Sequence, residues 1–364
     1  EIYIINFSIM AFEIDLLPVG SEKKSGDCIA MRYGDLVKGK EKQTVIIVDG
    51  GYAGTWKDTL KPFLRKYYNC EINGKLHIDL VVLSHPDLDH VSGLVEMAKD
   101  DEVKIGMIMM HRPWEEITPS WFKDGRITKN SLKDKLGDAF EKAKELADET
   151  LNISQTKLEV GTYTFNKASI TILGPTSDFY KTCIANCEKT PPQGKLVKNL
   201  PQTQGGNGAI AFEPYVKGKI KWDDSESTSP INESSLIILF EYEGTKVLFT
   251  GDAGKEGLSK AIKYAHDNNI KLNDCSIIKM PHHGSRKNVN PAIMDAFVGS
   301  RALYYSCASD DLGHHPSQRL INLMNEKNFK QFSTSGSTLH YGKNAPDRGW
   351  KTASVFISSD KIEK

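Results

Sequence analysis

Residues 80–94 read LVVLSHPDLDHVSGL and join an apolar run to a helix-like run through a short polar loop. The loop carries four side chains that can bind a cation: His85, Asp87, Asp89 and His90. The apolar run before it is typical of a buried strand. So many hydrated groups at a strand end are costly to desolvate unless a cation compensates them. The stretch therefore predicts a metal-binding loop at the edge of a sheet.

Similar side chains follow strand-like runs further along the chain. They lie in LFTGDAG, KMPHHGS and LGHHPS, and they are Asp252, His282, His283, His314 and His315. Functional groups of α/β folds gather where strands end and loops begin. Each motif alone also fits an ordinary turn or helix cap. Their joint occurrence favours one shared centre of His and carboxylate ligands, a donor set that suits Zn, Mn or Fe.

Strand-like and helix-like runs follow an order that predicts sheets packed together with helices outside. Short runs rich in Val, Ile and Leu dominate the first hundred residues, and apolar spacing predicts helices near 60–67, 131–150 and 254–268. Gly244 predicts a hairpin turn between two later strands. The polar stretch from about 186 to 233 is typical of a long loop or insertion.

Charge and composition narrow the classes of function. The 47 basic side chains balance 47 acidic ones, so no overall field favours nucleic acid or an anionic membrane. No apolar run approaches the ~20 residues that span a bilayer, and the start does not resemble a signal peptide. Six scattered cysteines without CxxC spacing are typical of reduced thiols. We therefore expect a cytoplasmic protein that does not bind membranes, of undetermined oligomeric state.

Taken in order, the motifs resemble the metallo-β-lactamase fold, in the branch of the DNA-uptake competence proteins (ComEC-type). FEIDLLPVG, SGDCIAMRY and TVIIVDGG are similar to that branch's opening strands, and SHPDLDH is similar to its HxDxDH loop. NESSLIILFEYEGTKVLFTGDAG, IIKMPHHGS and GHHPS follow in the same order. The resemblance implies an α/β fold, an αββα sandwich of two mixed β-sheets packed face to face with helices outside. Residues 11–364 are expected to form it as one domain with insertions near 112–156 and 186–233. Residues 1–10 are compatible with a non-native or upstream leader.

The resemblance also implies a centre of two divalent metal ions, Zn or Mn. His85 and Asp87 are expected to bind one ion, and Asp89 and His90 the other. Asp252 is expected to bridge the two ions. Carboxylate oxygens are harder ligands than imidazole nitrogens and favour harder cations, so Mn²⁺ competes with Zn²⁺ as the native metal.

The remaining roles depend on the two later His pairs. His315 is expected to complete the second metal site. Many relatives supply another His in a GHxxG-like turn, where this chain has NESSL, so His283 is the expected substitute ligand at the first site. Asp89, Asp252 and His282 are the expected catalytic residues. The expected substrate contacts are Lys279, Ser285, Arg286 and His111, although Lys279 and His111 also fit ordinary surface positions.

These assignments predict hydrolysis by hydroxide that two metal ions activate. The sequence contains neither a GxSxG elbow nor a Walker-type phosphate loop. The first hypothesis is a phosphodiesterase or nuclease acting on DNA or RNA, and basic residues such as Arg286 and Lys287 offer local positive charge. The alternatives are a small phosphodiester, such as a phosphorylcholine ester or signalling nucleotide, and a lactone, amide or thioester. A purely structural metal site is disfavoured, because such sites usually close with four Cys or His ligands.

Overall fold

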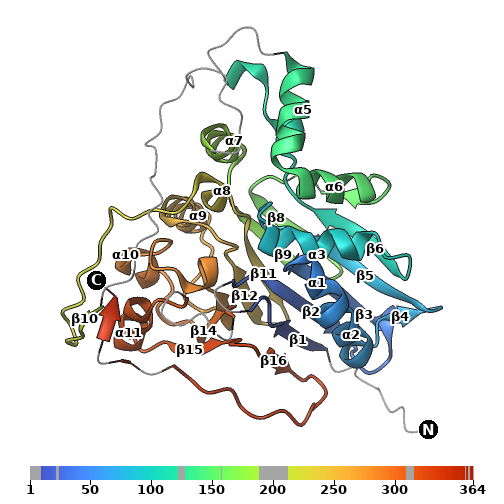
Figure 1. The fold of residues 1–364 in the computed structure, drawn as a ribbon. Coiled ribbons are helices and arrows are strands. Elements are labelled where there is room, and N and C mark those ends of the chain that lie inside the picture. Colours follow the sequence, from blue (N-terminus) through green and yellow to red (C-terminus); the bar gives the residue numbers. More distant parts are fainter. Residues whose placement is uncertain are drawn as a thin grey trace, which may run out of the picture.

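The predicted αββα sandwich is confirmed by a computed structural model, in which two mixed sheets face each other and helices cover both outer faces (Figure 1). The structure describes residues 10–21, 24–121, 128–156, 158–187, 212–308, 315–356, 358–359 and 361–363. The first nine residues, which fall in the expected leader, lie outside this range. The single-domain division stays a prediction.

The first sheet has the strand order β16-β1-β2-β3-β5-β6-β7, with β4 beside β5. Its strands are β1 Ala11–Leu16, β2 Cys28–Gly34, β3 Gln43–Gly50, β4 Glu71–Ile72, β5 Lys75–Val82, β6 Val103–Met109, β7 Ser154–Gln155 and β16 Leu339–Lys343. The four apolar runs expected as strands in the first hundred residues form β1, β2, β3 and β5. Strands β3, β5 and β6 are parallel, so β5 and β6 end at the same edge of the sheet.

The second sheet has the order β15-β14-β13-β12-β11-β9-β8. Its strands are β8 Gly161–Phe165, β9 Ala168–Gly174, β11 Ile237–Tyr242, β12 Thr245–Phe249, β13 Ile277–Lys279, β14 Ala302–Tyr305 and β15 Lys330–Ser333. The predicted hairpin joins β11 to β12. Its two turn residues, Glu243 and Gly244, have φ of 47° and 72°, the left-handed backbone that a tight hairpin turn requires. A separate two-stranded sheet pairs β10 Phe212–Pro214 with β17 Lys361–Glu363.

Three apolar layers hold the sandwich together. Between the sheets, alternate side chains of each strand interdigitate, and the rings of Phe12 and Phe240 stack with centroids 5.7 Å apart. Outside the first sheet lie α1 Ala53–Thr55, α2 Lys61–Phe63, α3 Leu88–Ala98, α4 Pro113–Glu116, α5 Lys129–Ala139 and α6 Glu141–Glu149. The second sheet carries α9 Lys255–Asp267, α10 Pro291–Asp295 and α11 Gln318–Glu326. The short helices α7 Ser177–Asn186 and α8 Pro230–Glu233 lie between these two groups in the chain.

Several elements differ from their predicted extents. The helix expected at 131–150 is two helices, because Phe140 leaves the helical backbone with φ −120° and ψ 45° and its side chain is buried in the core. The helix expected near 60–67 belongs to a longer helical segment at 53–68, parts of which have the wider π-helical turn. The polar stretch at 186–233 contains β10 and α8, and its residues 188–211 lie outside the described part.

The six cysteines are buried and form no disulfide in the structure. Within the described ranges, no helix combines the length and the apolar character needed to cross a bilayer.

Candidate metal centre

The HPDLDH loop leaves β5 at the edge of the first sheet and enters α3. Asp87 is the N-cap residue of α3, and its backbone carbonyl accepts from the backbone N–H of His90 and of Val91 at 3.0 Å. Its carboxylate makes no capping hydrogen bond. Instead, Asp87 Oδ2 lies 3.7 Å from His85 Nε2. The loop therefore begins the helix through its backbone and leaves its carboxylate facing an imidazole.

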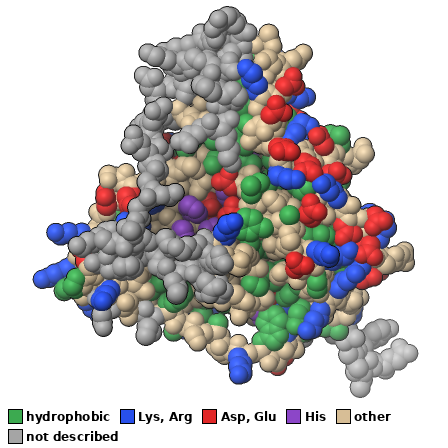
Figure 2. Space-filling model, viewed as in Figure 1, with side chains coloured by type: hydrophobic (Ala, Val, Ile, Leu, Met, Phe, Trp, Pro, Cys, Tyr) green, Lys and Arg blue, Asp and Glu red, His purple; other side chains and the backbone are tan. Residues whose placement is uncertain are grey.

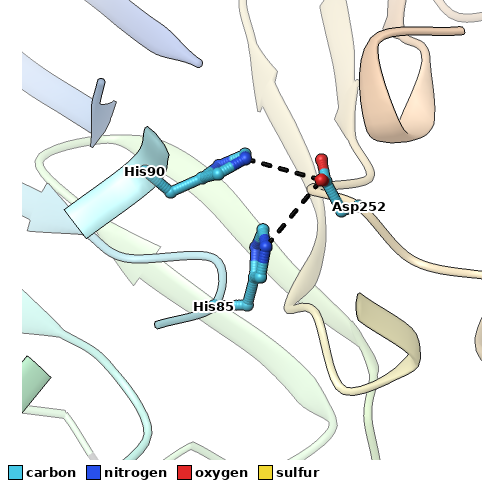
Figure 3. Close-up of side chains that lie close together, drawn as sticks. All are labelled: His85, His90 and Asp252. Carbon is cyan, nitrogen blue, oxygen red and sulfur yellow. Dashed lines mark ion pairs between the residues drawn. The ribbon is translucent and has the colours of Figure 1, made fainter. Parts of the chain in front are cut away.

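A buried group of three side chains joins this loop to the second sheet. Asp252 lies in the turn after β12, and its Oδ2 is 3.8 Å from His85 Nε2 and 3.5 Å from His90 Nε2 (Figure 3). Both imidazoles are fully buried, and the Asp252 side chain is 3% exposed. The two loops come from different sheets, so the sandwich itself brings these residues together.

A second group extends from His90 toward the PHHG turn after β13. Asp89 Oδ2 lies 3.6 Å from His90 Nε2 and 3.4 Å from His283 Nε2. His283 therefore lies beside the pair that the sequence assigned to the second metal, whereas it was expected at the first. His282 Nε2 faces Asp252 Oδ2 at 3.9 Å, and its side chain is 32% exposed.

The PHHG turn holds both imidazoles through an uncommon backbone. His282 and His283 have φ of 44° and 55°, a left-handed conformation that costs a non-glycine residue about 1–2 kcal/mol. Gly284 follows with φ 88°, and a Cβ there would lie 2.6 Å from the ring of Tyr305 and from Pro316 Cβ. Such strain persists where the surrounding structure over-determines it, often at functional sites.

The GHHPS motif is partly within the described residues. His315 lies against the PHHG turn, with ring centroids 5.3 Å from His282 and 5.9 Å from His283. His314 lies outside the described residues. Figure 2 shows histidine side chains gathered near the middle of one face of the molecule, beside acidic side chains.

Two buried carboxylates behind the ligand candidates were not predicted from the sequence. Asp49, at the end of β3, accepts a hydrogen bond from Ser84 Oγ at 2.6 Å and lies 2.9 Å from His90 Nδ1. Ser84 Oγ is also 3.1 Å from His85 Nδ1. Asp27, directly before β2, lies 3.4 Å from His283 Nδ1. Carboxylates in such places orient metal-binding imidazoles. The signal in the sequence was an Asp next to Gly at a strand terminus, in SGDC and VDGG.

The charges of the centre raise or lower several pKa values. Burial opposes protonation of His90, but the surrounding Asp252, Asp89 and Asp49 outweigh it and hold the pKa of His90 well above its usual 6.5. Burial also opposes protonation of His283, but the negative charge of Asp252 and other carboxylates outweighs it and raises the pKa of His283 to about 9. Burial raises the pKa of Asp252, yet the neighbouring His90 and other imidazoles hold it well below its usual 3.8. The cluster therefore attracts positive charge.

The geometry fits a divalent cation. Among the described residues, neither His85 Nε2 nor His90 Nε2 has a hydrogen-bond partner, although both atoms are buried. Two ligands bound about 2.1 Å from one tetrahedral ion would lie about 3.4 Å apart. The distances of 3.5 Å and 3.8 Å to Asp252 are close to this value and too long for hydrogen bonds. A cation would satisfy these nitrogen lone pairs and the carboxylate together.

The expected substrate contacts have other partners in the structure. Lys279 is 1% exposed, forms an ion pair with Asp27 and donates to the Gly251 carbonyl at 2.9 Å, so protein oxygens enclose its ammonium. Arg286 pairs with Glu226 at 2.9 Å.

His111 and Ser285 are likewise enclosed by protein. His111 stacks on Tyr180 with centroids 3.8 Å apart and lies 3.0 Å from Glu116, so it is packed against protein rather than at the ordinary surface position expected as the alternative. Ser285 is buried directly beyond the PHHG turn, where its hydroxyl accepts from the Lys287 N–H.

Part of the chain is similar in sequence to known proteins. Residues 36–154 match the model of the Metallo-beta-lactamase superfamily, a segment that contains the HPDLDH loop and α3. Over 111 residues, 30% of this chain, the sequence is 27% identical to ComE operon protein 3 of Bacillus subtilis (strain 168). The aligned part spans 14% of that protein.

Solved structures of low sequence identity are also similar to the chain. The metallo-beta-lactamase fold protein YhfI from Bacillus subtilis is 10% identical with a TM-score of 0.43, covering 92% of this chain and 100% of that one. Zn(2+)-bound PqqB from Methylobacterium extorquens is 9% identical with a TM-score of 0.44, covering 90% of this chain and 99% of that one.

Proposed function

We propose that this protein is a metal-dependent hydrolase that cleaves phosphodiester bonds, with nucleic acid as its substrate. The observation that carries the proposal is the buried group of His85, His90 and Asp252. Both Nε2 atoms face the carboxylate and have no hydrogen-bond partner among the described residues. The match of residues 36–154 to the Metallo-beta-lactamase superfamily supports the hydrolase class. The resemblance of the ordered motifs to those of DNA-uptake competence proteins is the ground for proposing nucleic acid as the substrate.

The side chains of the centre divide into holding and positioning groups. His85, His90 and Asp252 would hold one cation. Asp89 and His283 would hold a second beside it, and His90 lies within reach of both groups. Bound divalent cations supply Lewis acidity and lower the pKa of water toward neutrality. Because the enclosing loops come from both sheets, the centre is preorganised before substrate arrives.

His282 is the residue of the pair that faces outward. Its Nδ1 lies 3.2 Å from Asn288 Oδ1, so a proton on Nδ1 leaves the Nε2 lone pair directed at the centre. Because 32% of its side chain is exposed, His282 can contact a substrate or exchange a proton with solvent water. We assign it to proton transfer or substrate contact.

A second candidate function is hydrolysis of a small phosphodiester. The pairing of Arg286 with Glu226 favours it, because a neutralised arginine does little to attract a polyanionic backbone. The balanced total charge points in the same direction. The two candidates share the metal chemistry and differ in the size of the substrate.

The test is a side-by-side assay of metal-loaded protein. Mn²⁺- and Zn²⁺-loaded samples are incubated with single-stranded DNA, double-stranded DNA, RNA, bis-p-nitrophenyl phosphate, a lactone and a thioester. Asp252→Asn keeps the shape of the side chain and removes its charge, so we expect it to fold and to lose activity by orders of magnitude. Cleavage of lactones or thioesters without cleavage of any phosphodiester would exclude the proposal.

Charge reversal distinguishes polymer from small substrate. If nucleic acid binds near the PHHG turn, Arg286→Glu/Lys287→Glu should raise the apparent Kd for DNA and flatten its dependence on salt. Hydrolysis of bis-p-nitrophenyl phosphate should barely change. The matched control, Lys263→Glu/Lys330→Glu, alters total charge equally on α9 and β15 and should leave DNA affinity unchanged. Equal effects of the two double variants would favour the small substrate.

A further inference from the structure

A buried ion pair connects the two sheets directly beneath the candidate metal centre. Asp27 directly precedes β2 of the first sheet, and Lys279 is the last residue of β13 in the second sheet. Each side chain is 1% exposed. The ammonium also donates to the Gly251 carbonyl at 2.9 Å and lies 3.7 Å from Asp252 Oδ1. Desolvation makes such a pair weak evidence for stability, since apolar residues of similar volume often serve equally well. Its presence calls for another explanation.

The second oxygen of Asp27 faces a candidate metal ligand. Asp27 Oδ1 lies 3.4 Å from His283 Nδ1, and on the opposite side of the ring His283 Nε2 lies 3.4 Å from Asp89 Oδ2. An imidazole whose Nδ1 proton points at a carboxylate presents its Nε2 lone pair to a metal. His90 shows the tighter form of this arrangement, because Asp49 lies 2.9 Å from its Nδ1 and its Nε2 has no hydrogen-bond partner among the described residues. For His283 the contact of Nδ1 with Asp27 is longer and makes no hydrogen bond, and Nε2 lies within hydrogen-bond distance of Asp89.

The local chain holds Asp27 firmly in this place. Its backbone N–H donates to the Asp89 carbonyl at 3.1 Å. A Cβ on the preceding Gly26 would lie 2.7 Å from that same carbonyl oxygen, so only glycine allows this approach. Ser306 Oγ, which follows β14, donates to the Gly26 carbonyl at 2.6 Å. The segment is therefore fixed between α3 and the second sheet.

We propose that Asp27, held by Lys279, is a positioning residue that orients His283 for cation binding and couples the two halves of the centre. Lys279 takes one carboxylate oxygen, which leaves the other for His283. The ammonium also offsets negative charge that Asp27 adds to a cluster already containing Asp49, Asp89 and Asp252. This inference rests on the metal-binding part of the proposed function and is independent of the substrate.

The variant Asp27→Leu/Lys279→Met tests the proposal, because it replaces the whole pair by apolar side chains and strands no buried charge. Chelator competition with Zn²⁺ should show two tight sites in the wild type. In the variant, the affinity of one site should fall about 10–100-fold, the range for lost orienting partners, while the other site is retained. The visible spectrum of the Co²⁺-loaded protein should change, since His283 would no longer be held in place.

The matched control removes another Lys–Asp pair from the first sheet. Lys40 and Asp79 pair at 2.7 Å between the start of β3 and β5. Lys40→Met/Asp79→Leu should lower stability without altering either Zn²⁺ affinity or the Co²⁺ spectrum. If the Asp27 double variant does not fold, Asp27→Asn, which keeps the shape, should still weaken one site at least about tenfold.

The outcomes separate this inference from the proposed function. Wild-type affinities and spectrum in folded Asp27→Leu/Lys279→Met or in Asp27→Asn would overturn the positioning role and leave the metal centre intact. A wild-type protein that binds no divalent cation would overturn the proposed function, and the positioning role with it. Equal loss in the Lys40→Met/Asp79→Leu control would also overturn it, by showing a general effect on stability.

Discussion

His282 and His283 are neighbours in the sequence, yet their surroundings differ sharply. His283 is buried between Asp89 and Asp27, with an oxygen 3.4 Å from each ring nitrogen. His282 is 32% exposed and lies 3.9 Å from Asp252. Because both residues have left-handed backbone, their side chains diverge from one tight turn. The turn thus supplies an inner and an outer imidazole.

This difference predicts distinct effects of two alanine substitutions. His283→Ala should lower the content of tightly bound metal after dialysis, measured by elemental analysis, because it removes a buried ligand candidate. His282→Ala should retain the metal and mainly lower kcat. His266→Ala, an exposed histidine on α9, is the control and should change neither quantity. Metal loss from His282→Ala with full retention in His283→Ala would reverse the assignment.

At the residue scale, the sequence predicted the groups on the loops better than the groups behind them. His85, Asp87, Asp89 and His90 are close in sequence, so the strand-loop-helix pattern was enough to group them. The contact of Lys279 with Asp27 depends on how two sheets stack, which no local pattern encodes. The enclosed position of Lys279 and the pairing of Arg286 with Glu226 were missed for the same reason.

At the scale of elements, the chain beyond β16 places Arg348 against the first sheet. Arg348 pairs with Glu13 at 2.6 Å and with Asp15 at 2.8 Å, and both carboxylates lie fully buried on β1. The guanidinium also lies over the rings of Tyr67 and Trp350, 4.9 Å from each centroid. The chain after β16 therefore supplies a positive charge beside the buried carboxylates of Glu13 and Asp15.

We expect Arg348→Met to lower the free energy of unfolding by at most about 3–5 kcal/mol, since it removes a cation from two buried carboxylates that keep Arg32, Tyr68 and His340 as neighbours. Urea denaturation of the metal-free protein measures the change. Arg301→Met, at an exposed position, is the control and should stay within about 0.5 kcal/mol of the wild type. A similarly small change for Arg348→Met would show that other partners, such as Arg32 on Glu13, suffice.

Elements with strong local patterns were predicted well, and those defined by distant pairing were not. The amphipathic spacing of α9 and the apolar runs of β1, β3 and β5 identify them directly. Strand β16 was not anticipated, because it closes the first sheet by pairing with β1 from the far end of the chain. Its short half-buried sequence carries little signal of its own.

For the whole molecule, removal of metal should give stability a characteristic dependence on pH. In the structure, Lys279 and nearby imidazoles outweigh burial and lower the pKa of Asp27 to about 2, from 3.8. Its contribution is complete above pH 3.8 and is lost as the pH falls through about 2. The pKa of His283 is raised from 6.5 to about 9, so its contribution is complete below pH 6.5 and is lost as the pH rises through about 9.

The Tm of chelator-treated protein should therefore fall as the pH rises from 6.5 to about 9. Zn²⁺-loaded protein should not, because a cation takes the place of the proton on His283. Thermal unfolding across this range, with and without chelator, measures the difference. His283→Gln, which cannot be protonated there, should reduce the alkaline loss and leave the part due to His90, whose pKa is also held well above 6.5. An equal slope in the variant would assign the effect to another group.

The division of the centre between two sheets has a consequence for how the protein is made. A ribosome that has released the first half of the chain has produced the whole HPDLDH motif without Asp252 or the PHHG turn. A nascent chain at that stage lacks part of the centre. A cation that needs ligands from both sheets would therefore be bound late in biosynthesis, after the second sheet docks on the first.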